Sequence, residues 1–209
     1  MVAEREEVKK VTESRIDTST LESNALLSMI TSGLAIVAGV FTSLNTVPGK
    51  EAFYTFLGTM FILAAIIESL GTLKLFKANF TLMSKLALES IIGLIFLLGG
   101  SLLEPATSIL IFVLYLSLFI FGNVVLSQEL YPLPGWLLSL LIGIGGAFLI
   151  GFVVFMASQY SIYQVLATAL GTTLMLDGIL FGYISIVAFR KGYKKCIDCF
   201  SNSQEEGKK

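Results

Sequence analysis

The sequence contains no histidine, two cysteines, four prolines and one tryptophan, and only 14% of its 209 residues carry a charge. Without histidine, the chain lacks the commonest metal ligand and the usual proton shuttle near neutral pH. Two cysteines are too few for a structural zinc site within one chain, because such a site takes four ligands. The net charge of −1 implies no bulk attraction to nucleic acid. These absences argue against most enzymes and nucleic-acid-binding proteins, and we expect neither a catalytic reaction nor a cofactor.

Apolar residues, in contrast, are abundant. They make up 55% of the chain, and the mean hydropathy of +0.84 lies outside the range of soluble globular domains. The apolar runs are continuous and do not alternate with polar residues, which favours helices over barrel strands. A helix of about 20 apolar residues crosses a hydrocarbon core about 30 Å thick. The composition therefore predicts an all-α integral membrane protein, with the lipid bilayer as its main partner.

Short polar or proline-containing breaks divide the apolar residues into six predicted spans, at about 26–44, 53–75, 86–103, 107–126, 136–157 and 165–188. Residues 1–24 are charged and contain no apolar core, so they do not read as a secretory signal peptide. We expect a charged cytoplasmic arm at 1–24, a membrane domain at 25–190 and a basic cytoplasmic tail at 191–209.

Three segments share one outline, LLSMITSGLAIVAGV, LALESIIGLIFLLGG and LLSLLIGIGGAFLIG. Aligned on their glycines, Gly33 and Gly39 stand over Gly93 and Gly99, and over Gly145 and Gly151. Each segment opens an odd-numbered span and is followed by a second apolar span. The pattern predicts a six-helix bundle built from three helical-hairpin repeats.

The basic residues predict the orientation in the membrane. Of the 14 lysines and arginines, all except Lys50 fall in the N-terminal arm, in the loop assigned to Lys74, Lys77 and Lys85, or in the C-terminal tail. Loops rich in lysine and arginine stay in the cytoplasm. Both termini are therefore expected to be cytoplasmic, in a multi-pass protein of the cell membrane.

The three predicted hairpins resemble the HdeD family of acid-resistance membrane proteins. Each hairpin begins with a glycine-punctuated helix and ends in a helix with an acid-or-small dipeptide near its inner end. The dipeptides are Glu68-Ser69 and Asp177-Gly178, with Phe121-Gly122 as the middle copy. The resemblance covers about residues 26–191, and it implies a six-span protein of a prokaryotic cytoplasmic membrane, linked to acid or general stress by an unsettled mechanism. Phe121 departs from the repeat, and both tails lie outside it.

Glu68, Glu89 and Asp177 are the acids within the predicted spans. A carboxylate at the centre of a membrane helix costs about 2.5–3.5 kcal/mol on insertion scales, so such groups usually face the bundle interior. One hypothesis is that these acids, with Asn123 near them, form a proton-responsive cluster that is neutral in acid, charged otherwise, and biases helix packing. The alternative is structural: Glu89 pairs with Lys85 one turn away, and Glu68 is held by Asn123 or by hydroxyl groups.

Small residues recur at helical spacing and let helix backbones approach closely. Gly178 and Gly182 form a literal G-x-x-x-G motif. Packing of this kind acts within one subunit or between copies, so a homo-oligomer is an expected state. The predicted packing glycines are Gly33, Gly39, Gly93, Gly99, Gly145, Gly151, Gly178 and Gly182.

Cys196 and Cys199 form a C-x-x-C in the C-terminal tail. Two subunits together would supply four thiolates, and a cysteine beside basic residues near a membrane is also a candidate for acylation. Since the motif alone is a weak signal, we expect reduced thiols and no bound metal.

Two other functions stay open beside the stress role. One is a small proton, ion or solute transporter or channel in which Glu68, Asn123 and Asp177 line a polar path. The repeats are predicted to be parallel and no span contains proline, whereas many transporters use inverted repeats and broken helices. The other is a membrane scaffold that binds partner proteins through its glycine faces and charged arm. A membrane enzyme is the least favoured reading.

Overall fold

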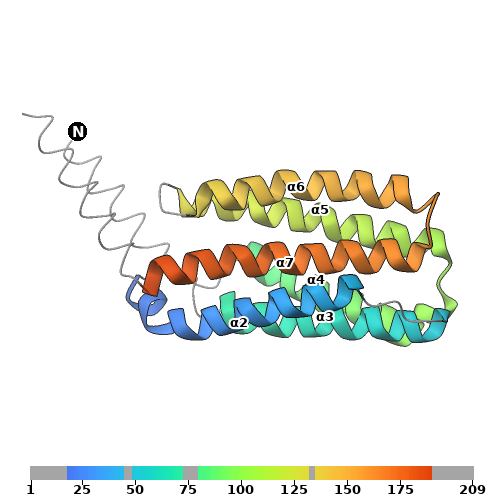
Figure 1. The fold of residues 1–209 in the computed structure, drawn as a ribbon, viewed down its shortest axis with the longest axis horizontal. Coiled ribbons are helices and arrows are strands. Elements are labelled where there is room, and N and C mark those ends of the chain that lie inside the picture. The colour runs from blue at the N-terminus through green and yellow to red at the C-terminus, as the bar shows by residue number, and fades with distance from the viewer. Residues whose placement is uncertain (1–17, 45–48, 73–79, 132–134, 190–209) are drawn as a thin grey trace, which may run out of the picture.

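The computed structural model of the protein describes residues 18–44, 49–72, 80–131 and 135–189. These residues form α2 (Thr18–Leu44), α3 (Lys50–Thr72), α4 (Phe80–Gly99), a short 3-10 turn η1 (Gly100–Leu102), α5 (Pro105–Leu130), α6 (Trp136–Met156) and α7 (Ile162–Phe189). Successive α-helices run in opposite directions along one bundle (Figure 1). The predicted all-helical class is confirmed for the part of the chain that the structure describes.

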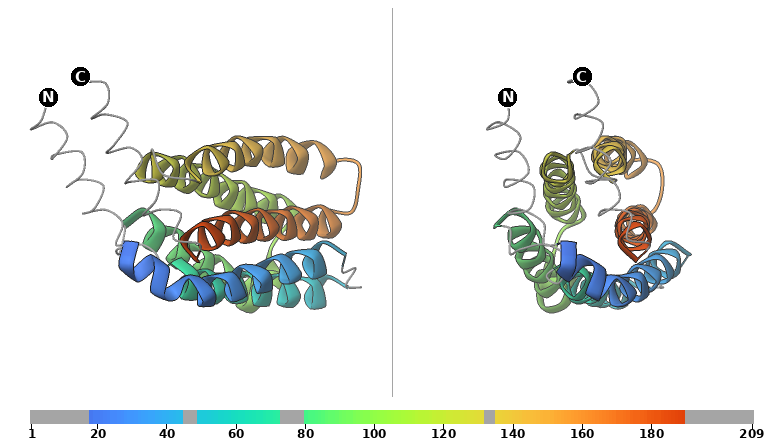
Figure 2. Two further views of the ribbon diagram at one scale, coloured as in Figure 1. Left: turned by 60° about the vertical axis from the view of Figure 1, so that its left-hand side comes forward. Right: turned by 90° about the vertical axis from the view of Figure 1, so that its left-hand side faces the viewer.

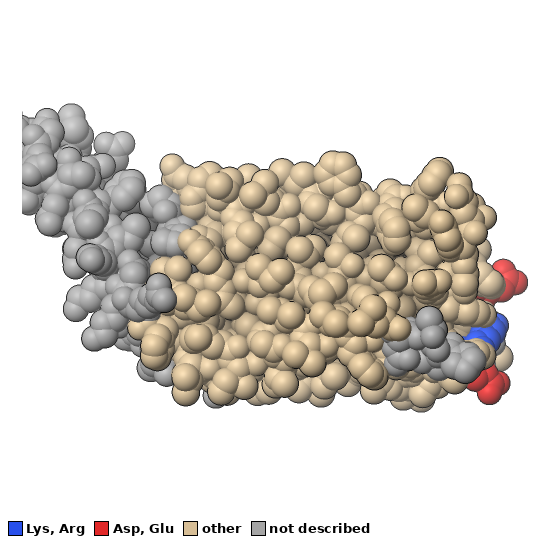
Figure 3. Space-filling model, in the orientation of Figure 1, with Lys and Arg blue, Asp and Glu red and all other residues tan. Residues whose placement is uncertain are grey.

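Five of these helices are long and apolar enough to cross a membrane, namely α2 from Asn24, α3 to Leu70, α5 to Gln128, α6 and α7. α4, with 20 residues, is not among them. Large apolar side chains on the outside of the bundle, such as Leu98 and Phe148, are 77% exposed. On the face shown in Figure 3, the charged side chains of the described residues lie at one end of the bundle. These features are those of a membrane-embedded protein.

The turns at that charged end and at the opposite end follow from local residue chemistry. Gly49 and Gly135 precede α3 and α6 with φ of +94° and +106°, a left-handed conformation that glycine adopts without steric cost. Pro105 occupies the first turn of α5, where its missing N–H would have no helical partner. These residues reverse the chain within a few positions and make successive helices antiparallel.

Two helices begin earlier than the sequence predicts. α2 starts at Thr18, so residues 18–24, assigned to the charged arm, are helical. α4 starts at Phe80, so Lys85 lies inside a helix and not in a basic loop as predicted. The physical reason is that Lys85 is neutralised by buried acids and is only 8% exposed. Lys74, Lys77, Cys196 and Cys199 lie outside the described residues.

The tightest helix contacts do not follow the predicted hairpins. α2 packs most extensively against α7, α3 against α4, and α5 against α6. The hairpins α2–α3, α4–α5 and α6–α7 make smaller contacts. Figures 1 and 2 show α7 beside α2, while α5 and α6 run together as a separate pair. The bundle is thus closed by its first and last described helices.

Four of the predicted glycines lie at close helix contacts. A methyl group added to Gly39 would lie 2.5 Å from the carbonyl oxygen of Gly171. At Gly178 it would lie 2.8 Å from the Ser32 carbonyl oxygen, and Gly182 approaches the same serine less closely. Gly93 fits in the same way against α3. These contacts explain the close approach of α2 to α7 and of α3 to α4.

The other four glycines require a correction as packing positions within this bundle. A methyl group at Gly33, Gly99, Gly145 or Gly151 would meet nothing within 4 Å. Alignment on the repeat missed other glycines that do pack closely, among them Gly58 against Gly93 and Gly171 against Gly39. The repeat outline therefore does not identify the helix contacts, because those contacts join different repeats.

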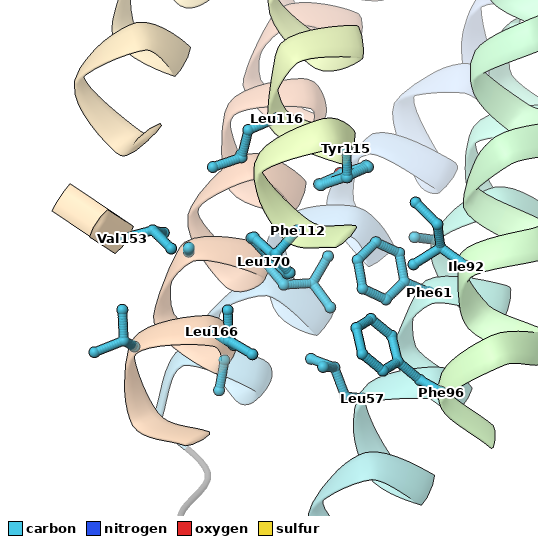
Figure 4. Close-up of a cluster of buried hydrophobic side chains, with 14 of the residues drawn as sticks. Leu57, Phe61, Ile92, Phe96, Phe112, Tyr115, Leu116, Val153, Leu166 and Leu170 are labelled. Atoms are coloured by element: carbon cyan, nitrogen blue, oxygen red, sulfur yellow. The ribbon is translucent and has the colours of Figure 1, made fainter. Parts of the chain in front are cut away.

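Two hydrophobic clusters fill the interior, one toward each end of the bundle. The larger contains Phe61, Phe96 and Phe112 together with residues of α7 (Figure 4). The smaller includes Phe119 on α5 and Ile184 on α7, and Trp136 packs against it. Glu68, Glu89 and Asp177 are buried but belong to neither cluster.

Candidate functional site

Four charged side chains from three helices meet in the interior, and we call them the Lys85 cluster: Glu68 of α3, Lys85 and Glu89 of α4, and Asp177 of α7. Lys85 Nζ donates hydrogen bonds to Asp177 Oδ2 at 2.6 Å and to Glu68 Oε2 at 2.9 Å. It lies 3.7 Å from Glu89 Oε1. All four residues are buried, with exposures of 5%, 8%, 0% and 2% in the order given.

The helix geometry explains how these side chains meet. Lys85 and Glu89 are separated by one helical turn and share one face of α4. The close approach of α3 to α4 at Gly58 and Gly93 holds the face that bears Glu68 beside them. Asp177 completes the group from α7, where it follows Thr173 by one turn. Lys85 therefore lies within 4 Å of all three acids of the cluster, and it joins α3, α4 and α7.

α5 provides the surface on which the lysine lies. Lys85 Nζ is 5.2 Å from the centre of the Phe119 ring, a distance suited to a cation–π contact. A methyl group at Gly122 would lie 3.9 Å from Lys85 Cδ. Gly122 is the second residue of the middle dipeptide, and it leaves room for the lysine stem beside α5. Its neighbour Phe121 is 58% exposed.

Glu89 has the weakest set of partners in the cluster. It is completely buried, and neither of its carboxylate oxygens accepts a hydrogen bond from the part of the chain that the structure describes. Tyr115, the fifth titratable group nearby, interacts electrostatically with Glu89 and is hydrogen-bonded to Thr173 at 3.2 Å. Glu89 is therefore a buried carboxyl group whose partners are the Lys85 ammonium at 3.7 Å and the Tyr115 hydroxyl.

The hydrogen bonds of Asn123 differ from the predicted alternative in which it holds Glu68. Its Nδ2 donates to the Phe119 carbonyl oxygen at 3.0 Å. Ser139 Oγ donates to the Asn123 carbonyl oxygen at 2.8 Å. Asn123 thus joins α5 to α6. Buried hydroxyl groups connect other helices in the same way. Ser185 Oγ of α7, for example, donates a hydrogen bond to Ser28 Oγ of α2 at 2.6 Å.

The cluster contains three carboxyl groups and one ammonium group. With every group ionised its formal charge would be −2, which is costly in a buried site. Two positive charges restore neutrality, and protons on the carboxyl groups are the simplest source. Among the described residues, no group of three or more acid, cysteine or histidine side chains is arranged to hold a metal ion. The cluster is thus suited to binding protons. Each proton that a carboxylate takes up replaces its ion pair with Lys85 by a neutral carboxyl group.

Lys85 is the residue of the candidate site that the sequence did not place at its centre. Its one signal was the four-residue spacing to Glu89, but the polar residues before it suggested a loop. The sequence offered a cluster of these acids as one hypothesis, from the cost of burying each carboxylate, but it did not indicate that they surround one lysine. Comparison with known proteins gives no further guidance, because no protein-family model, curated protein or solved structure matches this chain.

Proposed function

We propose that this protein is a proton-responsive, multi-pass membrane protein, without enzymatic activity, that acts in acid or general stress resistance as the HdeD resemblance implies. The observation that supports this function is the buried ammonium of Lys85, the one cation among the described residues that contacts Glu68, Glu89 and Asp177. A cluster with more carboxyl groups than cations changes its net charge when protons arrive. Because three helices contribute to it, that change acts on helix packing.

The response has two stages that follow from counting charges. Up to two protons remove the excess negative charge and leave Lys85 with one ionised partner. A third proton removes that partner and leaves the ammonium buried without an anion, which is strongly unfavourable. Strong acid therefore loosens the attachment of α4 to α3 and α7. The loosened bundle is the acid-induced state that we propose.

The proposed setting is the cytoplasmic membrane of a prokaryote, with six spans and both termini in the cytoplasm. The distribution of lysine and arginine supports this orientation, even though Lys85 no longer counts as a loop residue. The end of the bundle with Glu104 and Lys50 would then face outward. The three glycine-punctuated segments support an origin from three hairpin repeats whose helices now pack across repeat boundaries.

The test uses the intrinsic fluorescence of the purified protein. Trp136 is the single tryptophan, and it packs against the cluster of apolar residues that contains Phe119, on which Lys85 lies. On acidification, wild-type fluorescence should change cooperatively, and Glu89→Gln should shift or remove the change. Glu51→Gln, at the exposed start of α3, is the matched control and should behave as wild type.

The cellular test is survival of acid by cells that lack this protein and carry either the wild-type gene or the Glu89→Gln gene. Wild type should restore survival and the variant should not, at equal amounts in the membrane. A fluorescence change that is identical in wild type and Glu89→Gln would rule out the cluster as the sensor. Equal survival of cells with the wild-type and the Glu89→Gln gene would show that the stress role does not depend on the proton response.

A further inference from the structure

The Lys85 cluster lies close to one end of α3 and of α4, although its Asp177 lies near the middle of α7. Glu68 is within about 6 Å of the end of α3, and Lys85 within about 8 Å of the start of α4, at 1.5 Å per helical residue. Both are slightly exposed, whereas Glu89, one turn deeper, is completely buried. The end of α3 and the start of α4 lie at the same end of the bundle, as does the end of α7 (Figure 1).

Toward the opposite end, the cluster meets a continuous apolar layer, which we define as Phe61, Phe96, Phe112 and Leu170. Phe61 precedes Glu68 by seven residues, Phe96 follows Glu89 by seven, and Leu170 precedes Asp177 by seven. Seven residues correspond to about 10 Å along a helix, so the three side chains lie at one level. Each of the four layer residues is at most 1% exposed.

Ring contacts close this layer. The Phe61 ring centre is 5.9 Å from that of Phe96 and 5.8 Å from that of Phe112. Figure 4 shows Phe61 beside Phe96, with Phe112 and Leu170 facing them. Beyond the layer, Leu57 and Leu166 are also fully buried. The next polar contact toward that end is the hydrogen bond of 2.8 Å between Tyr54 and Ser108.

Among the residues that the structure describes, no titratable group bridges the layer. The described titratable groups that face the cluster are its own three acids and Lys85, together with Tyr115 of α5. α6, and α2 from Asn24 onward, contain no ionisable side chain. A proton that leaves Glu89 toward the Tyr54 end would have to cross apolar side chains that offer no acceptor.

We propose that the apolar layer makes the Lys85 cluster a one-sided proton sensor, which exchanges protons only with the bundle end where α3 and α7 end. This inference rests on the proposed proton response and adds its direction. One-sided access distinguishes this protein from a proton conduit, because a conduit needs access for protons from both ends. In the proposed orientation, the sensed compartment is the cytoplasm.

The first test is proton flux into liposomes that contain the full chain, with a trapped pH indicator and the membrane potential clamped. Wild type should leak no faster than protein-free liposomes. Phe61→Ser and Phe96→Ser should each open a leak, and adding Glu89→Gln should close it. Phe148→Ser, on the exposed face of α6, is the control and should stay tight.

A wild-type leak that Glu89→Gln abolishes would overturn the one-sided proposal and make the protein a conduit, while leaving the proton response intact. Tight liposomes with both layer variants in folded form would also overturn it, because the layer would not be the barrier. The flux measurement does not use Trp136 fluorescence. A failed fluorescence response would therefore count against the proposed proton response and not against the apolar barrier.

A second test needs no layer variant. Wild-type liposomes are acidified on one side at a time while Trp136 fluorescence is recorded. An impermeant thiol reagent reports the side of Cys196 and Cys199, which follow α7 and are the only cysteines. A response confined to acid on the cysteine side is expected, and an equal response to acid on either side would overturn the inference.

Discussion

Lys85 Nζ and Asp177 Oδ2 lie 2.6 Å apart, although 92 positions separate the two residues in the chain. This ion pair connects α4 to α7, whose most extensive partners are α3 and α2. Because both side chains are buried, the attraction between them is weakly screened by solvent. The pair therefore joins two tightly packed helix pairs, and its ionisation bears directly on the packing of the whole bundle.

Removal of the buried ammonium should be strongly destabilising. Lys85→Met leaves three carboxyl groups without a cation, and loss of one partner from a buried pair typically costs about 3–5 kcal/mol. Chemical or thermal unfolding in detergent at neutral pH measures the loss. Lys50→Met, at the charged end of the bundle, is the control for losing a lysine. Equal stability of Lys85→Met and wild type would show that the acids do not depend on this cation.

Two acid replacements should change stability in opposite directions at neutral or mildly alkaline pH. Asp177→Asn removes the shortest bond to Lys85 and should lower the free energy of unfolding by about 1.5–3 kcal/mol, the range for a hydrogen bond to a charged group. Glu89→Gln removes an excess negative charge and should raise the melting temperature. Melting curves of both variants in one detergent provide the comparison. A loss of stability in both variants would contradict the claim that the cluster carries excess negative charge at this pH.

Glycine replacements on α2 should distinguish the closed face from the open one. Gly39→Leu forces a side chain against Gly171 and Met175 and should separate α2 from α7, with a loss of at least 1–3 kcal/mol, about the cost of overpacking. Gly33→Leu meets open space and should leave the monomer unchanged. Unfolding and size-exclusion chromatography measure both effects. Disruption by Gly33→Leu would instead reveal a contact between copies.

The hydrogen bond between α5 and α6 should contribute modestly. Ser139→Ala removes the donor to the Asn123 carbonyl oxygen. Hydrogen bonds between membrane helices average about 0.6 kcal/mol in double-mutant cycles, so a loss near that value is expected. Ser158→Ala, whose hydroxyl bonds within an exposed turn, serves as the reference in the same unfolding assay. A loss above about 2 kcal/mol would assign Asn123 and Ser139 a larger role than packing.

The sequence predicts the helical class well, because continuous apolar runs are strong and local signals. It predicts helix starts less well, since Lys85 looks like a loop residue until its buried partners are known. The sequence did not predict which helices pack together. Gly39 contacts Gly171 of another repeat, whereas the alignment matched Gly39 with Gly99 and Gly151. Glu68, Glu89 and Asp177 were selected by the cost of burying charge, but their meeting around one lysine depends on tertiary packing.

The central claim is that the carboxyl groups of the Lys85 cluster take up protons on acidification. Infrared difference spectra of the protein in liposomes, recorded between neutral and acid pH, detect protonated carboxyl groups directly. Wild type should show more protonated-carboxyl absorption than the Glu68→Gln, Glu89→Gln and Asp177→Asn variants, beyond the loss seen in the surface control Glu104→Gln. Spectra in which the three cluster variants match wild type would contradict the account, because the buried acids would then bind no protons over that range.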